Sequence, residues 1–502
     1  MKPMMSPLIM LRVACLVVLL ASAAFTGMGL RQVHGLAPDM DDAEIAARLD
    51  AVLAQSMERY SIAGVAAGAI RDGQVIWRAR EGRSSAAGAP VTDATAFNLG
   101  SISKPLTVWT VLRLAQTGLI DLDAPLSDYD LPYQLEYANH DPAEVTVRRL
   151  LRHTAGTNQP GYGEYGAHEV QPVDVLELSE DFAPVRVIYP PGEVRRYSGG
   201  GYVLLQMLVE SATGQDFDSV TRQAVLDPLG MATAGFDPVR VPTVSQAFNY
   251  YRQPIQGLRD VALSAAGGYA SAGDIERFLL AHLDGGGVLE PDVLAQAFAP
   301  TEPHPGFAMS YTRWETPRGL LLGHGGNNST WHGQIYVRPQ TGDGFYFLTN
   351  ATSGAQLDID LSCAWLGGMS SATGTAVCAD ALSLTHKLSW FSWGVGMVAL
   401  FWLYWLAVGY LNGRRHFALR PSGRGPIRLT GRLALALVMA GLTVFLVWVF
   451  WTNSVIWRTQ TILIDELPFD ELEGLSLMMT SLFAILTLCL WSSPGRLADR
   501  RS

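Results

Sequence analysis

One serine and one lysine stand at a spacing that can support nucleophilic catalysis. Ser101 and Lys104 lie three residues apart in the segment Phe97-Asn-Leu-Gly-Ser-Ile-Ser-Lys, so a helix beginning there places both side chains on one face. A lysine can lose its proton when it is removed from water, whereas an arginine effectively cannot. Lysine is also scarce, because Lys2 and Lys387 are the only others in the chain. The pattern indicates a serine hydroxyl with a neighbouring base, although a capping serine and a surface lysine would give the same spacing.

Five further blocks follow the serine in chain order, each built around glycine, histidine or tyrosine. They are Val145–Gly156, Pro191–Tyr202, Asp227–Met231, Ala266–Ser271 and Gly323–Gly326. Together with Ser101–Lys104, they resemble the motifs of the penicillin-recognising serine hydrolases, and in particular the class C β-lactamase-like family. The resemblance covers about residues 42–366 and implies a β-lactamase-related serine hydrolase domain there.

The resemblance assigns roles to matching positions of this chain. Ser101 would be the nucleophile that forms an acyl-enzyme, with Lys104 and Tyr197 sharing its proton and Tyr197 acting as the general base. The backbone N–H groups of Ser101 and Asn327 would form the oxyanion hole beside the Gly326 turn. His324 would line the substrate side of the pocket. Without the family order, Tyr197 would be read as a core aromatic and His324 as a histidine at a strand end.

Three positions depart from the family pattern. Gly199 stands where an asparagine usually holds the acyl side chain, and His324 replaces a lysine, so it is mostly neutral at pH 7. Pro105 follows the lysine in the first turn of the expected helix. The first two departures favour an esterase or a D-amino-acid peptidase over a β-lactamase. The alternative function is a weakly catalytic sensor of penicillin or peptidoglycan fragments, acylated at Ser101 and signalling through membrane helices.

Composition narrows the classes of function. The 502 residues include 36 basic and 46 acidic side chains, a net charge of −10 that argues against nucleic-acid binding. The mean hydropathy of +0.17 excludes disorder for most of the chain. The ten histidines show no zinc-ligand spacing, and the glycine runs lack the lysine of a phosphate-binding loop. We therefore expect no metal and no cofactor, and a small-molecule or peptide-like acyl substrate.

Charged residues make up only 16% of the chain, against roughly 25% in a typical soluble protein. Uncharged stretches of about 20 residues, the length of a bilayer-spanning helix, are concentrated near the C-terminus. They predict three transmembrane helices after a linker at 367–387, within 388–495: 388–411, 433–456 and 474–492. Residues 1–30 are typical of a secretory signal peptide or an uncleaved signal anchor.

The charges between these stretches predict an orientation. Arginines fill the first connecting loop and acidic residues fill the second, which places the C-terminus in the cytoplasm. The sequence thus predicts a multi-pass protein of the bacterial cytoplasmic (inner) membrane, with its catalytic domain on the periplasmic or extracellular side. An oxidising compartment would permit a disulfide between Cys363 and Cys378, although two buried thiols are equally compatible with the sequence.

The order of strand and helix signals predicts the fold class. Alternating apolar residues mark a hairpin at 64–77 and strands near 320–322, 334–338 and 344–348, while the middle of the chain has helical periodicity. One sheet closed by the two ends of the domain, with helices between them, accounts for this order. We therefore expect an α+β fold: an antiparallel sheet flanked by helices, with an inserted all-helical region.

Overall fold

The computed structural model describes residues 40–158, 164–166, 185–255, 258–260, 262–328, 330–369, 408–409, 411–412, 415–417 and 492–494. The chain divides into two units, of which Val33–Val377 contains the fold considered below. The other unit comprises Met1–Gln32 and Cys378–Ser502. Within it the structure describes strands β13 (Arg415–Phe417) and β14 (Ser492–Pro494), which pair antiparallel.

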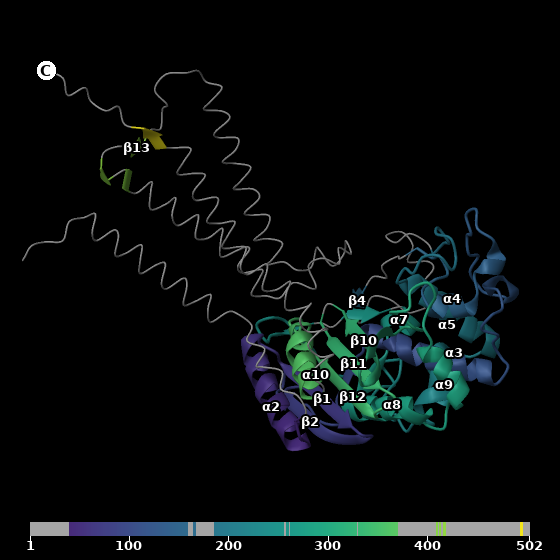
Figure 1. Ribbon diagram of the computed structural model, residues 1–502, viewed down its shortest axis with the longest axis horizontal. Coiled ribbons are helices and arrows are strands. Elements are labelled where there is room, and N and C mark those ends of the chain that lie inside the picture. The colour runs from purple at the N-terminus through teal and green to yellow at the C-terminus, as the bar shows by residue number, and fades with distance from the viewer. Residues whose placement is uncertain are drawn as a thin grey trace, which may run out of the picture. The chain divides into compact units, whose positions relative to one another are not determined.

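A six-stranded antiparallel sheet, in the order β2-β1-β12-β11-β10-β9, joins the two ends of the domain (Figure 1). Its strands are β1 (Gly64–Arg71), β2 (Gln74–Gly82), β9 (Thr312–Thr316), β10 (Gly319–Asn327), β11 (His332–Arg338) and β12 (Asp343–Thr349). Asp72 and Gly73 both have positive φ and make the two-residue turn between β1 and β2. Because β1 pairs with β12, the expected closure of one sheet by both ends of the domain is confirmed.

Helices cover both faces of this sheet. Successive strand residues point to opposite faces, and on β12 the ring of Phe345 lies 5.4 Å from that of Trp365 in α10 (Cys363–Met369). The hydroxyl of Tyr346, the next residue, donates to Glu276 of α8 (Ala272–Asp284). A further helix, α2 (Asp42–Arg59), contacts both β2 and α10 (Figure 1). The central strands are therefore buried on both sides, which gives the sheet a rigid frame.

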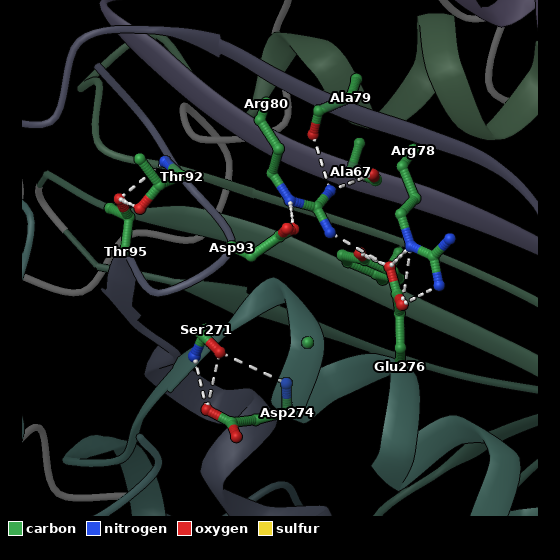
Figure 2. A network of polar contacts seen from close by, with 12 residues as sticks. Ala67, Arg78, Ala79, Arg80, Thr92, Asp93, Thr95, Ser271, Asp274 and Glu276 are labelled. Atoms are coloured by element: carbon green, nitrogen blue, oxygen red, sulfur yellow. Dashed lines mark hydrogen bonds and ion pairs between the residues drawn. The ribbon is translucent and has the colours of Figure 1, made fainter. Parts of the chain in front are cut away.

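A buried carboxylate fastens α8 to the sheet (Figure 2). Glu276 accepts hydrogen bonds from Arg78 at 2.9–3.0 Å, from Arg80 at 3.1 Å and from the Tyr346 hydroxyl at 2.7 Å. The Arg80 guanidinium also donates to Asp93 at 2.8 Å. A buried carboxylate persists only where charge and hydrogen bonds compensate its lost hydration, and here β2 and β12 supply both.

The helical region lies between the two halves of the sheet in sequence. It contains α3 (Ser103–Gln116), α4 (Val147–Leu151), α5 (Gly199–Thr213), α6 (Phe217–Thr221), α7 (Leu263–Ala266), α9 (Pro291–Phe298) and the single turns η1 (Gly100–Ile102), η2 (Leu126–Asp128), η3 (Pro142–Glu144) and η6 (Arg222–Leu226). Short strand pairs join β3 (Ala96–Asn98) to β8 (Tyr269–Ser271), β4 (Glu164–Gly166) to β7 (Leu258–Asp260), and β5 (Ala247–Phe248) to β6 (Pro254–Ile255), and the turn η7 (Asp358–Ser362) precedes α10. Most residues of α3 are buried, which identifies it as the central helix of the domain. The expected α+β fold is confirmed.

The expectation of three transmembrane helices is wrong. A bilayer-spanning helix needs about 20 mainly apolar residues, and no helix in the described part of the chain combines that length with that apolar character. The longest described helix, α2, carries acidic and basic side chains along its 18 residues and buries one face in the domain. The apolar stretches at 388–411, 433–456 and 474–492 fall mostly outside the described residues, as does the segment 1–30.

The localisation inferred from those helices is corrected by the same finding. The multi-pass inner-membrane placement was deduced from uncharged runs and from the arginines between them. Such runs report how apolar a segment is, and not what surrounds it. The described part of the chain holds no helix able to cross a bilayer, which contradicts the multi-pass membrane placement.

Candidate active site

Ser101 and Lys104 meet where η1 continues into α3. Ser101 is the middle residue of η1, and Lys104 is the second residue of α3. The Lys104 Nζ donates to Ser101 Oγ at 3.1 Å and to the Ala265 carbonyl at 2.7 Å. Lys104 is only 2% exposed, whereas Ser101 is half-buried. Pro105 stands in the first turn of α3, where a backbone N–H has no partner within the helix, so it leaves the pair intact.

Tyr197 brings its ring to the same lysine. It lies in the segment that leads into α5, and the Lys104 Nζ is 4.6 Å from its ring centroid. Tyr202, in α5, offers a second ring at 5.6 Å from the same nitrogen. No hydrogen bond of the Tyr197 hydroxyl is found among the described residues, so the lysine meets the face of this tyrosine. The ammonium is thus held by one hydroxyl, one carbonyl and two aromatic faces.

The ring of His153 packs against the ring of Tyr197. This histidine is 3% exposed and has a positive φ of 59°. Its Nδ1 accepts the Ser198 backbone N–H at 3.1 Å, and its ring lies 4.5 Å from that of Tyr197. Burial lowers the pKa of His153 well below its ordinary value, with Arg195 and Lys104 adding to the effect. A neutral imidazole, tilted by 34° against the tyrosine ring, therefore restricts the position of that ring.

His324 lies in the second half of β10, close to Tyr197. His324 is 8% exposed, its ring lies 6.2 Å from that of Tyr197, and its Nδ1 donates to the Gly325 carbonyl at 2.7 Å. Burial lowers the pKa of His324 to about 3, and the charges of Lys104 and Arg195 contribute. The histidine is therefore neutral at pH 7, and it does not supply the positive charge that a lysine would supply at this position.

The last residues of β10 pass against the turn that holds Ser101. A Cβ added to Gly326 would lie 1.9 Å from the Leu99 carbonyl oxygen. A Cβ added to Gly100, whose φ is +50°, would lie 2.9 Å from the Asn327 backbone nitrogen. Glycine at both positions therefore lets the two backbones approach closely. The approach brings the backbone of Asn327 next to the residue that precedes Ser101.

Two buried amides, which sequence reasoning missed, tie these backbones together. The Asn98 Oδ1 accepts the Gly100 N–H at 2.8 Å and the Asn328 Nδ2–H at 2.7 Å. The Asn328 Oδ1 in turn accepts the N–H groups of Thr330 and Trp331 at 2.9 and 2.7 Å. Asn98 and Asn328 are 230 residues apart in sequence, and no local pattern connects them. Asn98 lies three residues before Ser101, and Asn328 directly follows Asn327, so each is close in sequence to a predicted oxyanion donor.

The predicted disulfide lies away from these residues in the chain. Cys363 is the first residue of α10, is 4% exposed, and takes part in a disulfide. Cys378 lies outside the described residues, so the pairing of Cys363 with Cys378 stays a prediction.

A family model described as Beta-lactamase matches residues 49–362. The chain is 32% identical over 208 residues to Esterase EstB of Burkholderia gladioli, which covers 39% of this chain and 53% of that protein. It is 30% identical over 213 residues to Penicillin-binding protein 4 of Amycolatopsis lactamdurans, covering 40% and 54% respectively. The chain thus spans about half the length of these curated relatives.

The solved structures show the same likeness of fold. The crystal structure of a Beta-Lactamase/D-Alanine Carboxypeptidase from Pseudomonas syringae matches with a TM-score of 0.54 and 19% identity, over 64% of this chain and 98% of that one. Ser101, Lys104, Tyr197 and His324 all lie within the matched family region.

Proposed function

The chain belongs to the beta-lactamase family of serine hydrolases, and we propose that it hydrolyses ester or peptide-like acyl substrates through an acyl-serine at Ser101. The observation that carries the proposal is the 3.1 Å contact between the Lys104 Nζ and the Ser101 Oγ. A buried amine that bonds a half-exposed hydroxyl is the arrangement an activated nucleophile requires.

The proposed reaction has two halves. The Ser101 Oγ attacks the acyl carbonyl carbon and loses its proton, and the tetrahedral intermediate then expels an alcohol or amine that takes up a proton. Water attacks the resulting acyl-serine, the acid leaves, and the serine regains its hydrogen. The backbone N–H groups of Ser101 and Asn327 would stabilise the oxyanion in both halves.

Lys104 and Tyr197 divide the handling of the proton. The Lys104 Nζ donates to the Ser101 Oγ at 3.1 Å, so it would stabilise the negative charge that forms on this oxygen, while the Tyr197 base implied by the resemblance would take the proton. Tyr197, whose ring lies 4.6 Å from the lysine nitrogen, is then suited to pass a proton to the leaving group.

The surroundings favour esters and peptides over β-lactams. His324 is neutral, so the third motif offers no fixed cation to a β-lactam carboxylate. Gly199 begins α5 without the amide that would hold an acylamino side chain. The esterase relative is consistent with this preference.

The proposal is tested on the purified full chain by labelling with a probe and by measuring the turnover of esters. A fluorophosphonate probe should label the wild type and Ser103→Ala but not Ser101→Ala, since Ser103 is a buried serine that accepts the Gly268 N–H at 2.8 Å. p-Nitrophenyl esters should turn over with the same dependence on Ser101, and a chromogenic cephalosporin should turn over at least tenfold more slowly. Labelling of Ser101→Ala would contradict the nucleophile, and stable acylation without turnover would contradict the hydrolase.

A further inference from the structure

Arg195 shares a face of its segment with Tyr197. The N–H groups of Arg196 and Ser198 both bond His153, at 2.8 Å to its carbonyl and 3.1 Å to its Nδ1. The Arg195 N–H points elsewhere and donates to the His304 Nε2 at 3.1 Å. N–H groups that alternate in direction along a segment indicate an extended chain, in which side chains two residues apart lie on the same face. Arg195 therefore accompanies Tyr197, and Arg196 lies on the other face.

The guanidinium of Arg195 is fixed in place without a counter-charge. Its central carbon lies 3.5 Å from the ring centroid of Phe307, a contact that holds the planar group by its face. Its Nε is buried without a hydrogen-bond partner, and none of the ion pairs among the described residues involves Arg195. A planar guanidinium held by one face leaves its edge nitrogens available to a carboxylate.

The charge of Arg195 acts on the two histidines that lie beside Tyr197. It contributes, after burial and Lys104, to the lowered pKa of His324, and after burial to that of His153. Lys104 likewise has no carboxylate partner in the described part of the chain. The site thus holds two cations and two neutral histidines. An anionic ligand would neutralise part of this positive charge.

We propose that Arg195 binds a carboxylate carried by the acyl substrate, so that the enzyme prefers acidic acyl substrates to neutral ones of the same length. The proposal rests on the proposed function and names its substrate class. A charge-assisted pair with a partly desolvated guanidinium is stronger than one in open water.

Matched esters test this preference. Mono-p-nitrophenyl glutarate and adipate carry a carboxylate, and p-nitrophenyl valerate and hexanoate are their neutral counterparts. We expect the wild type to favour the acidic esters at least tenfold in kcat/KM. Arg195→Met should abolish that preference by raising KM for the acidic esters at least tenfold, while neutral esters change less than twofold.

Arg196 supplies the matched control. It is exposed and lies over the Tyr189 ring at 4.5 Å, so Arg196→Met removes the same charge one residue away and should leave both kinds of ester unchanged. Arg195→Lys should keep part of the preference. Equal effects of Arg195→Met on acidic and neutral esters, or equal effects of the two methionine variants, would overturn the proposal.

Two further measurements separate the possible failures. Free glutarate should inhibit turnover of the neutral ester by the wild type competitively, and glutaramide should not, which needs no variant to fold. Equal inhibition by both, or by neither, would refute the role of Arg195 while leaving the hydrolase intact. If neutral esters show no turnover that depends on Ser101, the proposed function itself fails.

Discussion

The amide pair Asn98–Asn328 offers the sharpest test of how the oxyanion hole is held. The Asn98 Oδ1 receives two hydrogen bonds, from the Gly100 N–H and the Asn328 Nδ2–H, at 2.8 and 2.7 Å. Both asparagines are at most 3% exposed. Asn98→Leu keeps the number of side-chain heavy atoms but removes the acceptor, which frees the turn before Ser101 from the end of β10.

The magnitude follows from the groups left unpaired. Each buried donor that loses its acceptor costs about 1–3 kcal/mol, so Asn98→Leu, which leaves two donors unpaired, should destabilise the fold by about 2–6 kcal/mol. Removing one oxyanion donor costs about 10²–10³-fold in kcat in other enzymes. Because Asn98 positions backbone donors without supplying one, we expect a loss near the lower end, about 10²-fold or 2.7 kcal/mol in the barrier. KM should change less than threefold.

Ester kinetics and fluorophosphonate labelling measure this loss. Asn328→Leu should resemble Asn98→Leu, and the double variant should lose no more activity than either single variant, since the two amides act as one unit. Asn350 is a matched control, because its buried amide donates to the Arg83 carbonyl at 3.1 Å, away from η1. Asn350→Leu should lower stability with kcat unchanged. A folded Asn98→Leu with kcat within threefold of the wild type would refute the positioning role.

Three further outcomes are expected. Glu276→Gln should lower the free energy of unfolding by about 3 kcal/mol in urea titrations because it breaks a buried ion pair, whereas Glu315→Gln, at an exposed pair, should cost less than about 1 kcal/mol. Gly326→Ala should reduce ester turnover at least tenfold, since its Cβ would meet a backbone oxygen at 1.9 Å, whereas in Gly325→Ala the Cβ meets the movable end of a side chain and activity should survive. Burial lowers the pKa of His282 from 6.5 to about 4; its contribution to stability is therefore complete above pH 6.5 and is lost as the pH falls toward 4. Urea titrations should show a loss of about 2 kcal/mol from this group between pH 7 and pH 5, and an unaltered pH dependence in His282→Gln would contradict it.

Local patterns predicted the hairpin of the sheet and the contact between the serine and the lysine. The hairpin at 64–77 corresponds to β1 and β2, and β2 continues to Gly82 because its later residues also pair with β1. The contact between Ser101 and Lys104 follows from one helical turn. These features depend on neighbours in sequence, so one sequence suffices to find them.

The supports of the site depend instead on residues that are distant in sequence. Asn98 and Asn328 meet only because β3 and β10 end at the same place. Arg195 lies within the Pro191–Tyr202 block but was not singled out there, since one arginine among 33 carries no local signal. The one available hint was its spacing of two residues from Tyr197 in a segment that lacks helix periodicity.

The charges of the site explain why its anion must come from the substrate. Lys104 is almost fully buried, yet its described partners are a hydroxyl, a carbonyl and aromatic rings, none of which carries a negative charge. Burying an unpaired cation is costly, and the cost is recovered when negative charge develops close by. When Ser101 attacks the acyl carbonyl, negative charge develops on the carbonyl oxygen. This charge is present in the transition state but absent from the free enzyme. The same unpaired ammonium that destabilises the free enzyme therefore lowers the barrier to acylation, which is how preorganised charge contributes to catalysis.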